Sequence, residues 1–234
     1  MTIFRLKQLA STSFHAAADA MHWNYDRAEM IADGVVHAIG VCVGLIAATV
    51  LIVLTAVYAT ALDIVAVSVY VAGLLAMLVL SATYNLWPVS RAKWVLRRFD
   101  HSAIYVLIAA TYTPLIMELK DSFFAVALLI GVWCLAIVGI VLKLALPGRF
   151  DRVSVGLYLA MGWSGMMLYD AVVKVLPTMA LACLIAGGVL YSLGVIFHAW
   201  RRLRFQNVIW HCFVLTGAAC HYTAVLDVVL ASGA

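Results

Sequence analysis

Long apolar runs recur along the chain, and each has about the length of a helix that crosses a membrane. A helix needs about 20 apolar residues to span the hydrocarbon core of a bilayer. The runs are continuous rather than alternating, and inside a bilayer helices satisfy their own backbone groups, so the pattern predicts helices rather than strands. Seven runs meet this description: Gly34–Tyr58, Ile64–Leu86, Ala103–Leu119, Phe123–Leu144, Val153–Leu176, Met179–Ala199 and Val208–Leu230. The fold class predicted is all-α, a polytopic membrane protein with seven transmembrane helices.

This pattern leaves little chain for any other domain. We expect an N-terminal segment (1–33), a seven-helix membrane domain (34–230) and a short C-terminal tail (231–234). The composition agrees, because 66% of the 234 residues are hydrophobic and only 11% are charged. A soluble domain is nearer half apolar and a quarter charged. A water-soluble enzyme, a nucleic-acid-binding protein and a disordered protein are therefore excluded.

The basic residues predict the orientation of the spans. Thirteen of the 15 Lys and Arg residues fall on one side of the predicted membrane: Arg5, Lys7, Arg27, Arg91, Lys93, Arg97, Arg98, Lys143, Arg149, Arg152, Arg201, Arg202 and Arg204. Only Lys120 and Lys174 fall on the other. Cytoplasmic loops carry such an excess of positive charge. The N-terminus is predicted to be cytoplasmic and the C-terminus outside.

Polar side chains gather at the predicted cytoplasmic ends of the spans, where ionisable groups are candidate functional residues. They are Asp33, His37, Ser81, Asn85, Asp100, His101, His198, Asn207 and His211. Ser81 and Asn85 lie four positions apart, as do Asn207 and His211, so each pair shares one helix face. His221 lies ten residues beyond His211, about 15 Å deeper at helical rise. Five predicted helices thus offer polar groups at a similar depth, as helix bundles do when they build a site.

Two smaller features suggest packing rather than chemistry. The five cysteines all fall within predicted spans and form no CxxC pair, so we expect free, buried thiols. Gly40 and Gly44 form a GxxxG motif, which predicts close helix packing within the bundle or between subunits of a homo-oligomer.

Three stretches, residues 29–37, then 81–85 with 92–104 and 110–114, and last 207–211, resemble motifs of the hemolysin III family, the bacterial branch of the progestin and adipoQ receptor (PAQR) proteins. Residues 29–37 (Glu-Met-Ile-Ala-Asp-Gly-Val-Val-His) resemble the family's Glu-x₂₋₃-Asn-x₃-His motif, with Asp33 in the Asn position. Residues 81–85, 92–104 and 110–114 resemble the second motif, and residues 207–211 (Asn-Val-Ile-Trp-His) resemble the third, His-x₃-His. The resemblance implies a seven-helix protein of the bacterial plasma (inner) membrane with a cytoplasmic N-terminus.

The resemblance also implies a zinc site near the cytoplasmic face. In the wider ceramidase-like superfamily, three histidines hold the ion, one from Ser-x₃-His on the second span and two from His-x₃-His on the seventh. The matching Ser and Asp, here Ser81 and Asp100, are implied to take part in hydrolysis of lipid amides or esters. Of the three ligand positions only His211 is a histidine, because Asn85 and Asn207 occupy the other two. An amide is a poor substitute for imidazole at zinc.

Two interpretations of the site therefore stay open. The zinc site has been lost, or a rearranged set uses His211 with His101, His37 or His221; Asp33 is a further candidate for the pocket. In the first case we expect a pocket that binds a membrane lipid or small amphiphile or that acts in membrane-stress signalling. In the second we expect a zinc-dependent lipid hydrolase.

Other functions fit less well. A transporter or channel is less favoured, because no internal repeat is evident. Retinal binding is excluded, since no Lys follows Lys174.

Overall fold

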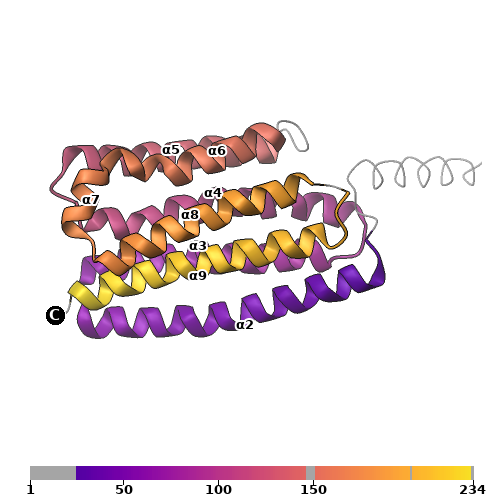
Figure 1. The fold of residues 1–234 in the computed structure, drawn as a ribbon, viewed down its shortest axis with the longest axis horizontal. Helices are drawn as coiled ribbons and strands as arrows, with labels where there is room; N and C mark the ends of the chain where they lie inside the picture. Colours follow the sequence, from indigo (N-terminus) through magenta and orange to yellow (C-terminus); the bar gives the residue numbers. More distant parts are fainter. Residues whose placement is uncertain (1–24, 146–150, 201, 233–234) are drawn as a thin grey trace, which may run out of the picture.

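The computed structural model describes residues 25–145, 151–200 and 202–232, and within these ranges it contains helices and no strand (Figure 1). Most of the predicted N-terminal segment lies outside the described residues. The helices are α2 (Arg27–Tyr58), α3 (Ala61–Leu86), α4 (Arg91–Met117), α5 (Phe123–Ala145), α6 (Asp151–Trp163), the 3₁₀ helix η1 (Ser164–Leu168), α7 (Tyr169–Val175), α8 (Thr178–Ala199) and α9 (Gln206–Ser232). The all-α prediction is confirmed.

Each predicted span coincides with one helix or, in one case, with a broken series. Five helices, α2, α3, α5, α8 and α9, are long and apolar enough to cross a membrane. Helix α4 is as long, but its first ten residues include four basic side chains. The fifth predicted span is divided into α6, η1 and α7. The chain is therefore an integral multi-pass membrane protein.

Several helices begin before their apolar runs because polar side chains cap them. Asp26 accepts from the backbone of Glu29 while Glu29 accepts from the backbone of Asp26, a capping box that starts α2 seven residues before the predicted span. Thr60 and Asp63 form the same box at α3, and Ser90 caps α4. Hydropathy alone does not detect these polar first turns.

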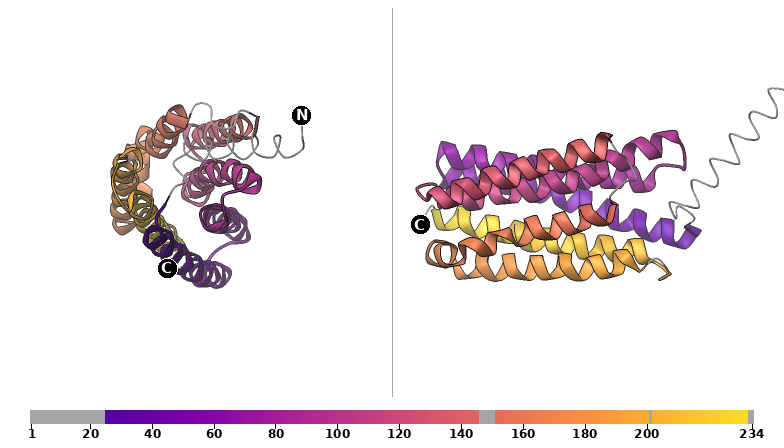
Figure 2. Two further views of the ribbon diagram at one scale, coloured as in Figure 1. Left: turned by 90° about the vertical axis from the view of Figure 1, so that its right-hand side faces the viewer. Right: turned by 90° about the horizontal axis from the view of Figure 1, so that it is seen from above.

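The helices form a ring when the bundle is seen end-on (Figure 2, left). Helix α2 contacts both α3 and α9, so the first and last described helices lie side by side. The interior between them is apolar, with Leu51, Tyr70 and Val225 fully buried. The starts of α2, α4 and α9 meet the ends of α3 and α8 at one end of the bundle, at the right of Figure 1, and we call this the polar end.

Glycines permit the close approach of neighbouring helices. A Cβ atom at Gly40 would lie 2.8 Å from Leu215, and one at Gly73 would lie 2.7 Å from Ala110. Gly44 is in similarly close contact with Leu78. The predicted close packing of the GxxxG motif is thus present within the bundle.

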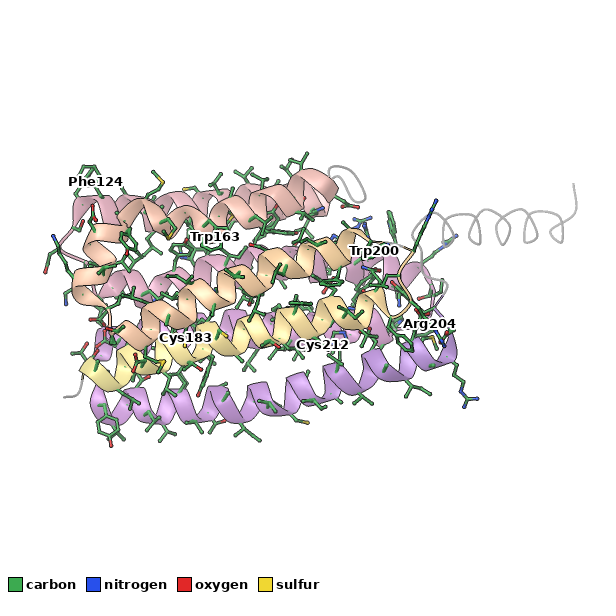
Figure 3. The ribbon with its side chains drawn as sticks, viewed as in Figure 1. Phe124, Trp163, Cys183, Trp200, Arg204 and Cys212 are labelled. Carbon is green, nitrogen blue, oxygen red and sulfur yellow. The ribbon has the colours of Figure 1, made fainter. Side chains whose placement is uncertain are left out.

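The outer surface is apolar. Ile46, Phe124 and Met167 are exposed, at 67%, 74% and 81%, and Phe124 projects outward at the start of α5 (Figure 3). Soluble monomers rarely expose contiguous apolar surface on this scale. All five cysteines are free, as predicted, but the expected burial is wrong, because Cys42, Cys134 and Cys212 lie on the outer, exposed faces of their helices.

The break in the fifth span is held by a hydroxyl from α4. The Tyr112 hydroxyl oxygen accepts from the Gly165 backbone N–H at 2.7 Å and lies 2.9 Å from the Met161 carbonyl oxygen. Ser164 donates to the same carbonyl at 2.7 Å. These contacts satisfy backbone groups that the interrupted α-helix leaves unpaired.

Candidate functional site

A cavity of about 1200 Å³ lies inside the ring of helices. Its wall is mostly apolar, with Leu107, Leu115, Leu119, Val172, Leu176 and Leu184 among the lining residues. Of the residues singled out in the sequence, it is lined by Ser81, Asn85, Asp100, His101, His198, Asn207, His211 and His221. Asp33 and His37 are not in its wall. The cavity therefore joins a polar region to a long apolar one.

Asp33, His37 and His211 converge at the polar end, and of the three only His211 also lines the cavity. All three are buried, with 6%, 5% and 7% of their surface exposed. The Asp33 Oδ1 atom lies 2.6 Å from His211 Nδ1, and Asp33 Oδ2 lies 3.6 Å from His37 Nε2. The two imidazole rings have centroids 4.4 Å apart. We call these residues the α2–α9 triad.

The α2–α9 triad arises from helix spacing. Asp33 and His37 are four residues apart and share one face of α2, and α9 presents His211 to that face. One potential ligand atom from each residue lies within 4.8 Å of the others. His37 Nε2 has no hydrogen-bond partner in the described part of the chain.

A chain of amides connects this triad to α3. Asn207 Nδ2 donates to Asp33 Oδ2 at 3.1 Å and lies 3.2 Å from Asn85 Oδ1. Asn85 Nδ2 donates to the backbone carbonyl of Ser81 at 2.9 Å. The two asparagines thus bind each other and the helices around them.

These contacts test whether the residues at the family positions fit zinc. Both asparagine side chains are used in hydrogen bonds, and the group that Asn207 directs toward Asn85 is a donor. A metal ion needs a lone pair, which an amide N–H does not supply. The three-histidine set implied by the resemblance therefore does not fit this chain.

Ser81 and Asp100 lie together in the cavity wall. Ser81 is buried at 9% exposure, and its hydroxyl interacts with the Asp100 carboxyl group. Both residues line the cavity, as does His211. The predicted catalytic pair is thus brought together at the polar end.

A second, partly buried polar cluster was not predicted. Asp151, at the start of α6, lies 2.6 Å from Arg97 Nη2 and 2.7 Å from Lys143 Nζ. His101 joins it, with Nδ1 at 4.0 Å from Asp151. We call these residues the α4–α6 ion cluster. Sequence reasoning counted the cations of this cluster only as loop charges. His101 lies in this cluster rather than beside His211.

Lys93 was also counted as a surface charge. Its side chain is buried, at 5% exposure for the residue, and its ammonium donates to the carbonyl oxygens of Asn85 and Trp87, each at 3.0 Å. It therefore satisfies the last carbonyls of α3, where a cation also complements the helix dipole.

Glu29 joins the start of α2 to the connection before α9. Its Oε1 atom accepts from the backbone N–H of Phe205 at 2.9 Å, and Phe205 has a positive φ of 59°. Arg204 donates to Asp26 at 3.1 Å beside it. The backbone N–H of Glu29, followed by Arg204, lowers the pKa of the Asp26 carboxyl group.

His221 lies away from both clusters. Its Nε2 atom is 3.3 Å from the carbonyl oxygen of Leu184 on α8, and its ring packs edge-on against Tyr191. It lines the cavity but adds no ligand to the triad.

Comparison with known proteins gives a consistent result. The family described as Haemolysin-III related matches residues 27–222. The chain is 37% identical over 198 residues to the hemolysin-3 homolog of Bacillus subtilis, which covers 85% of this chain and 93% of that protein. It is 35% identical over 202 residues to hemolysin-3 of Bacillus cereus, covering 86% and 92%.

The similarity extends to an animal protein. The chain is 30% identical over 163 residues to the human monocyte to macrophage differentiation factor, covering 67% of each chain. No solved structure matches the chain.

Proposed function

The chain belongs to the hemolysin III family, and from this premise we propose that it binds a membrane lipid or a small amphiphile in the cavity inside its ring of helices. The cavity carries this proposal, because one continuous space of about 1200 Å³ joins polar side chains to an apolar wall. A ligand with a polar head and an apolar tail matches such a division.

Each part of the cavity has a role in this proposal. Ser81, Asp100 and His211 supply hydrogen-bonding groups for the head of the ligand. The apolar wall, which includes Leu115 and Leu176, receives its tail. The loss of two family histidines supports binding without the family's three-histidine zinc chemistry.

We propose the topology that the charges predict. The helices α2, α3, α4, α5, α6–η1–α7, α8 and α9 make seven spans in a bacterial plasma membrane, with the polar end on the cytoplasmic side. The buried pairing of Arg97 and Lys143 with Asp151 supports inclusion of α4 and α6, because their charges are partnered rather than exposed to lipid.

Mass spectrometry of the purified full chain tests the proposal. Protein in mild detergent is washed, denatured and extracted, and one class of amphiphile is expected at near-equimolar amount. In Val214→Trp, a larger side chain enters the cavity wall, and co-purified amphiphile should fall at least about tenfold, which corresponds to 1.4 kcal/mol in binding.

Val43→Trp is the matched control. Val43 lies on the outer face of α2 at 58% exposure, so the same substitution adds bulk outside the cavity. It should leave the bound amphiphile unchanged. Equal retention by both variants would contradict binding inside the ring.

Lipid amide or ester hydrolysis is the second candidate. It is favoured by one observation, the contact of Ser81 with Asp100 in the cavity wall. Incubation with ceramides and lipid esters would then release fatty acid, and Asp100→Asn would stop the release while the amphiphile still binds. Binding without release in the unmodified chain would leave the first candidate alone.

A further inference from the structure

The α2–α9 triad has the composition of a metal site, and two of its three residues, Asp33 and His37, lie outside the family's ligand set. We propose that Asp33, His37 and His211 together bind one divalent metal ion of the zinc type. Two of the three ligands come from α2, which contributes none to the family's three-histidine set. The inference goes beyond amphiphile binding, because Asp33 and His37 do not line the cavity.

The first support is convergence. One potential ligand atom from each residue lies within 4.8 Å of the other two, and each residue is more than nine-tenths buried. Ligands on a common tetrahedral ion stand about 3.3 Å apart for bonds of about 2.0 Å. Small side-chain rotations from the present arrangement would reach that spacing.

The second support is an unpartnered atom. His37 Nε2 is buried, faces Asp33 Oδ2 at 3.6 Å and has no hydrogen-bond partner among the described residues. A distance of 3.6 Å is too long for a hydrogen bond. Buried polar atoms nearly always have a partner, so an atom of this kind aimed at a carboxylate calls for an explanation. A metal ion between them supplies one.

The donor set selects the class of ion. Two imidazoles and one carboxylate form a known zinc-binding combination, and zinc accepts nitrogen ligands readily. Calcium and magnesium prefer oxygen ligands and would find only one carboxylate here. The negative charge of Asp33 partly balances the ion, and no Lys or Arg belongs to the triad.

Asn207 and Asn85 have a positioning role in the proposed metal site. Asn207 donates to Asp33 Oδ2 at 3.1 Å and is itself linked to Asn85. Hydrogen bonds of this type orient a ligating carboxylate. The residues that replace two family histidines therefore position a ligand of the displaced site.

Metal titration of the full chain in detergent is the direct test. The protein is stripped with chelator, dialysed and titrated with Co²⁺, whose visible absorption reports tetrahedral coordination, and zinc content is then measured after gel filtration. One equivalent is expected. Absence of both the cobalt absorption and bound zinc in the unmodified chain would overturn the proposal.

Variants identify the ligands. His37→Gln and Asp33→Asn should lose the bound ion, and Asn207→Ala should weaken cobalt binding by about 10- to 100-fold. The control is His221→Gln, a substitution of another, partly buried histidine of α9 outside the triad, which should bind normally. Retention of one equivalent by His37→Gln would show that α2 supplies no histidine ligand and would overturn the proposal.

A conservative variant covers the case in which these proteins do not fold. His37→Cys keeps a metal ligand at position 37 and should add a thiolate-to-cobalt charge-transfer band in the near ultraviolet. Only direct coordination by residue 37 produces that band. A folded His37→Cys protein that binds cobalt with the unmodified spectrum would exclude His37 as a ligand. Amphiphile content is measured independently, so either proposal can fail alone.

Discussion

The two polar clusters at the polar end are built alike, around a carboxylate, but differ in the partners of that carboxylate. Each has a carboxylate at its centre, Asp33 in the α2–α9 triad and Asp151 in the α4–α6 ion cluster. Asp151 lies between two permanent cations at 2.6 and 2.7 Å. Asp33 lies between two imidazoles, one at 2.6 Å and the other at 3.6 Å without a hydrogen bond. In the ion cluster the carboxylate is paired with both cations. In the triad, His37 Nε2 has no hydrogen-bond partner among the described residues.

This difference distinguishes a polar cluster that stabilises the fold, the α4–α6 ion cluster, from one that is available for chemistry, the α2–α9 triad. A buried ion pair costs desolvation and is maintained only when its partners are well placed, as they are around Asp151. In the α2–α9 triad, by contrast, only one of the two imidazoles lies within hydrogen-bond distance of the carboxylate. The α4–α6 ion cluster joins α4, α5 and α6, and the α2–α9 triad joins α2 to α9.

Removal of Asp151 should have the largest effect. Asp151→Asn leaves Lys143 and Arg97 buried without a compensating charge, and breaking a buried pair in this way costs about 3–5 kcal/mol. Asp151 itself is partly exposed, so we expect the lower end of that range. Thermal unfolding in detergent, followed by circular dichroism, measures the loss.

The reciprocal variant provides the control. Lys143→Met keeps a side chain of similar length and leaves Asp151 paired with Arg97. It should lose clearly less stability than Asp151→Asn. Equal losses would mean that the carboxylate is not the centre of the cluster.

Removal of Asp33 should have an intermediate effect in the chelator-treated protein. Asp33→Ala deprives His211 and Asn207 of their acceptor, and hydrogen bonds to charged groups contribute about 1.5–3 kcal/mol. His37→Met, in contrast, removes a buried atom that has no partner among the described residues and should be nearly neutral without metal. A large loss of stability in His37→Met under chelator would contradict the conclusion that His37 Nε2 has no partner among the described residues.

The smallest effect is expected at the edge of the ion cluster. Tyr158 donates to the backbone carbonyl of His101 at 2.8 Å. Tyr158→Phe removes this bond and keeps the ring packed against Tyr105, so the expected loss is about 0.5–1.5 kcal/mol. The unfolding midpoint should shift slightly and the metal stoichiometry should not change; a change in stoichiometry would mean that the two clusters are coupled.

The fold was largely predictable from sequence because continuous hydropathy marks membrane helices. The predicted run Phe123–Leu144 and the helix Phe123–Ala145 differ by one residue at the end. The break in the fifth span was not predicted, since it depends on the hydroxyl of Tyr112, which is distant in sequence. The polar start of α4 was not predicted either, because its charges are paired only in three dimensions.

The candidate site was predictable in part. Spacing placed Asn207 and His211 on one face, and the motifs brought Ser81 to Asp100. Depth along the spans did not say which helices are neighbours, so His101, His37 and His221 were equal alternatives as partners of His211. The one available signal was Asp33 itself, a carboxylate where the resembling motif has Asn.

The contact between α2 and α9 has a consequence for how the protein is made. A ribosome produces α2 first among the described helices and α9 last, so the ring stays open through most of synthesis. The triad and the full wall of the cavity form only when the final helix inserts. Until then, lipid or another protein must cover the apolar helix faces that will border the cavity. We therefore expect the nascent bundle to depend on the membrane insertion machinery.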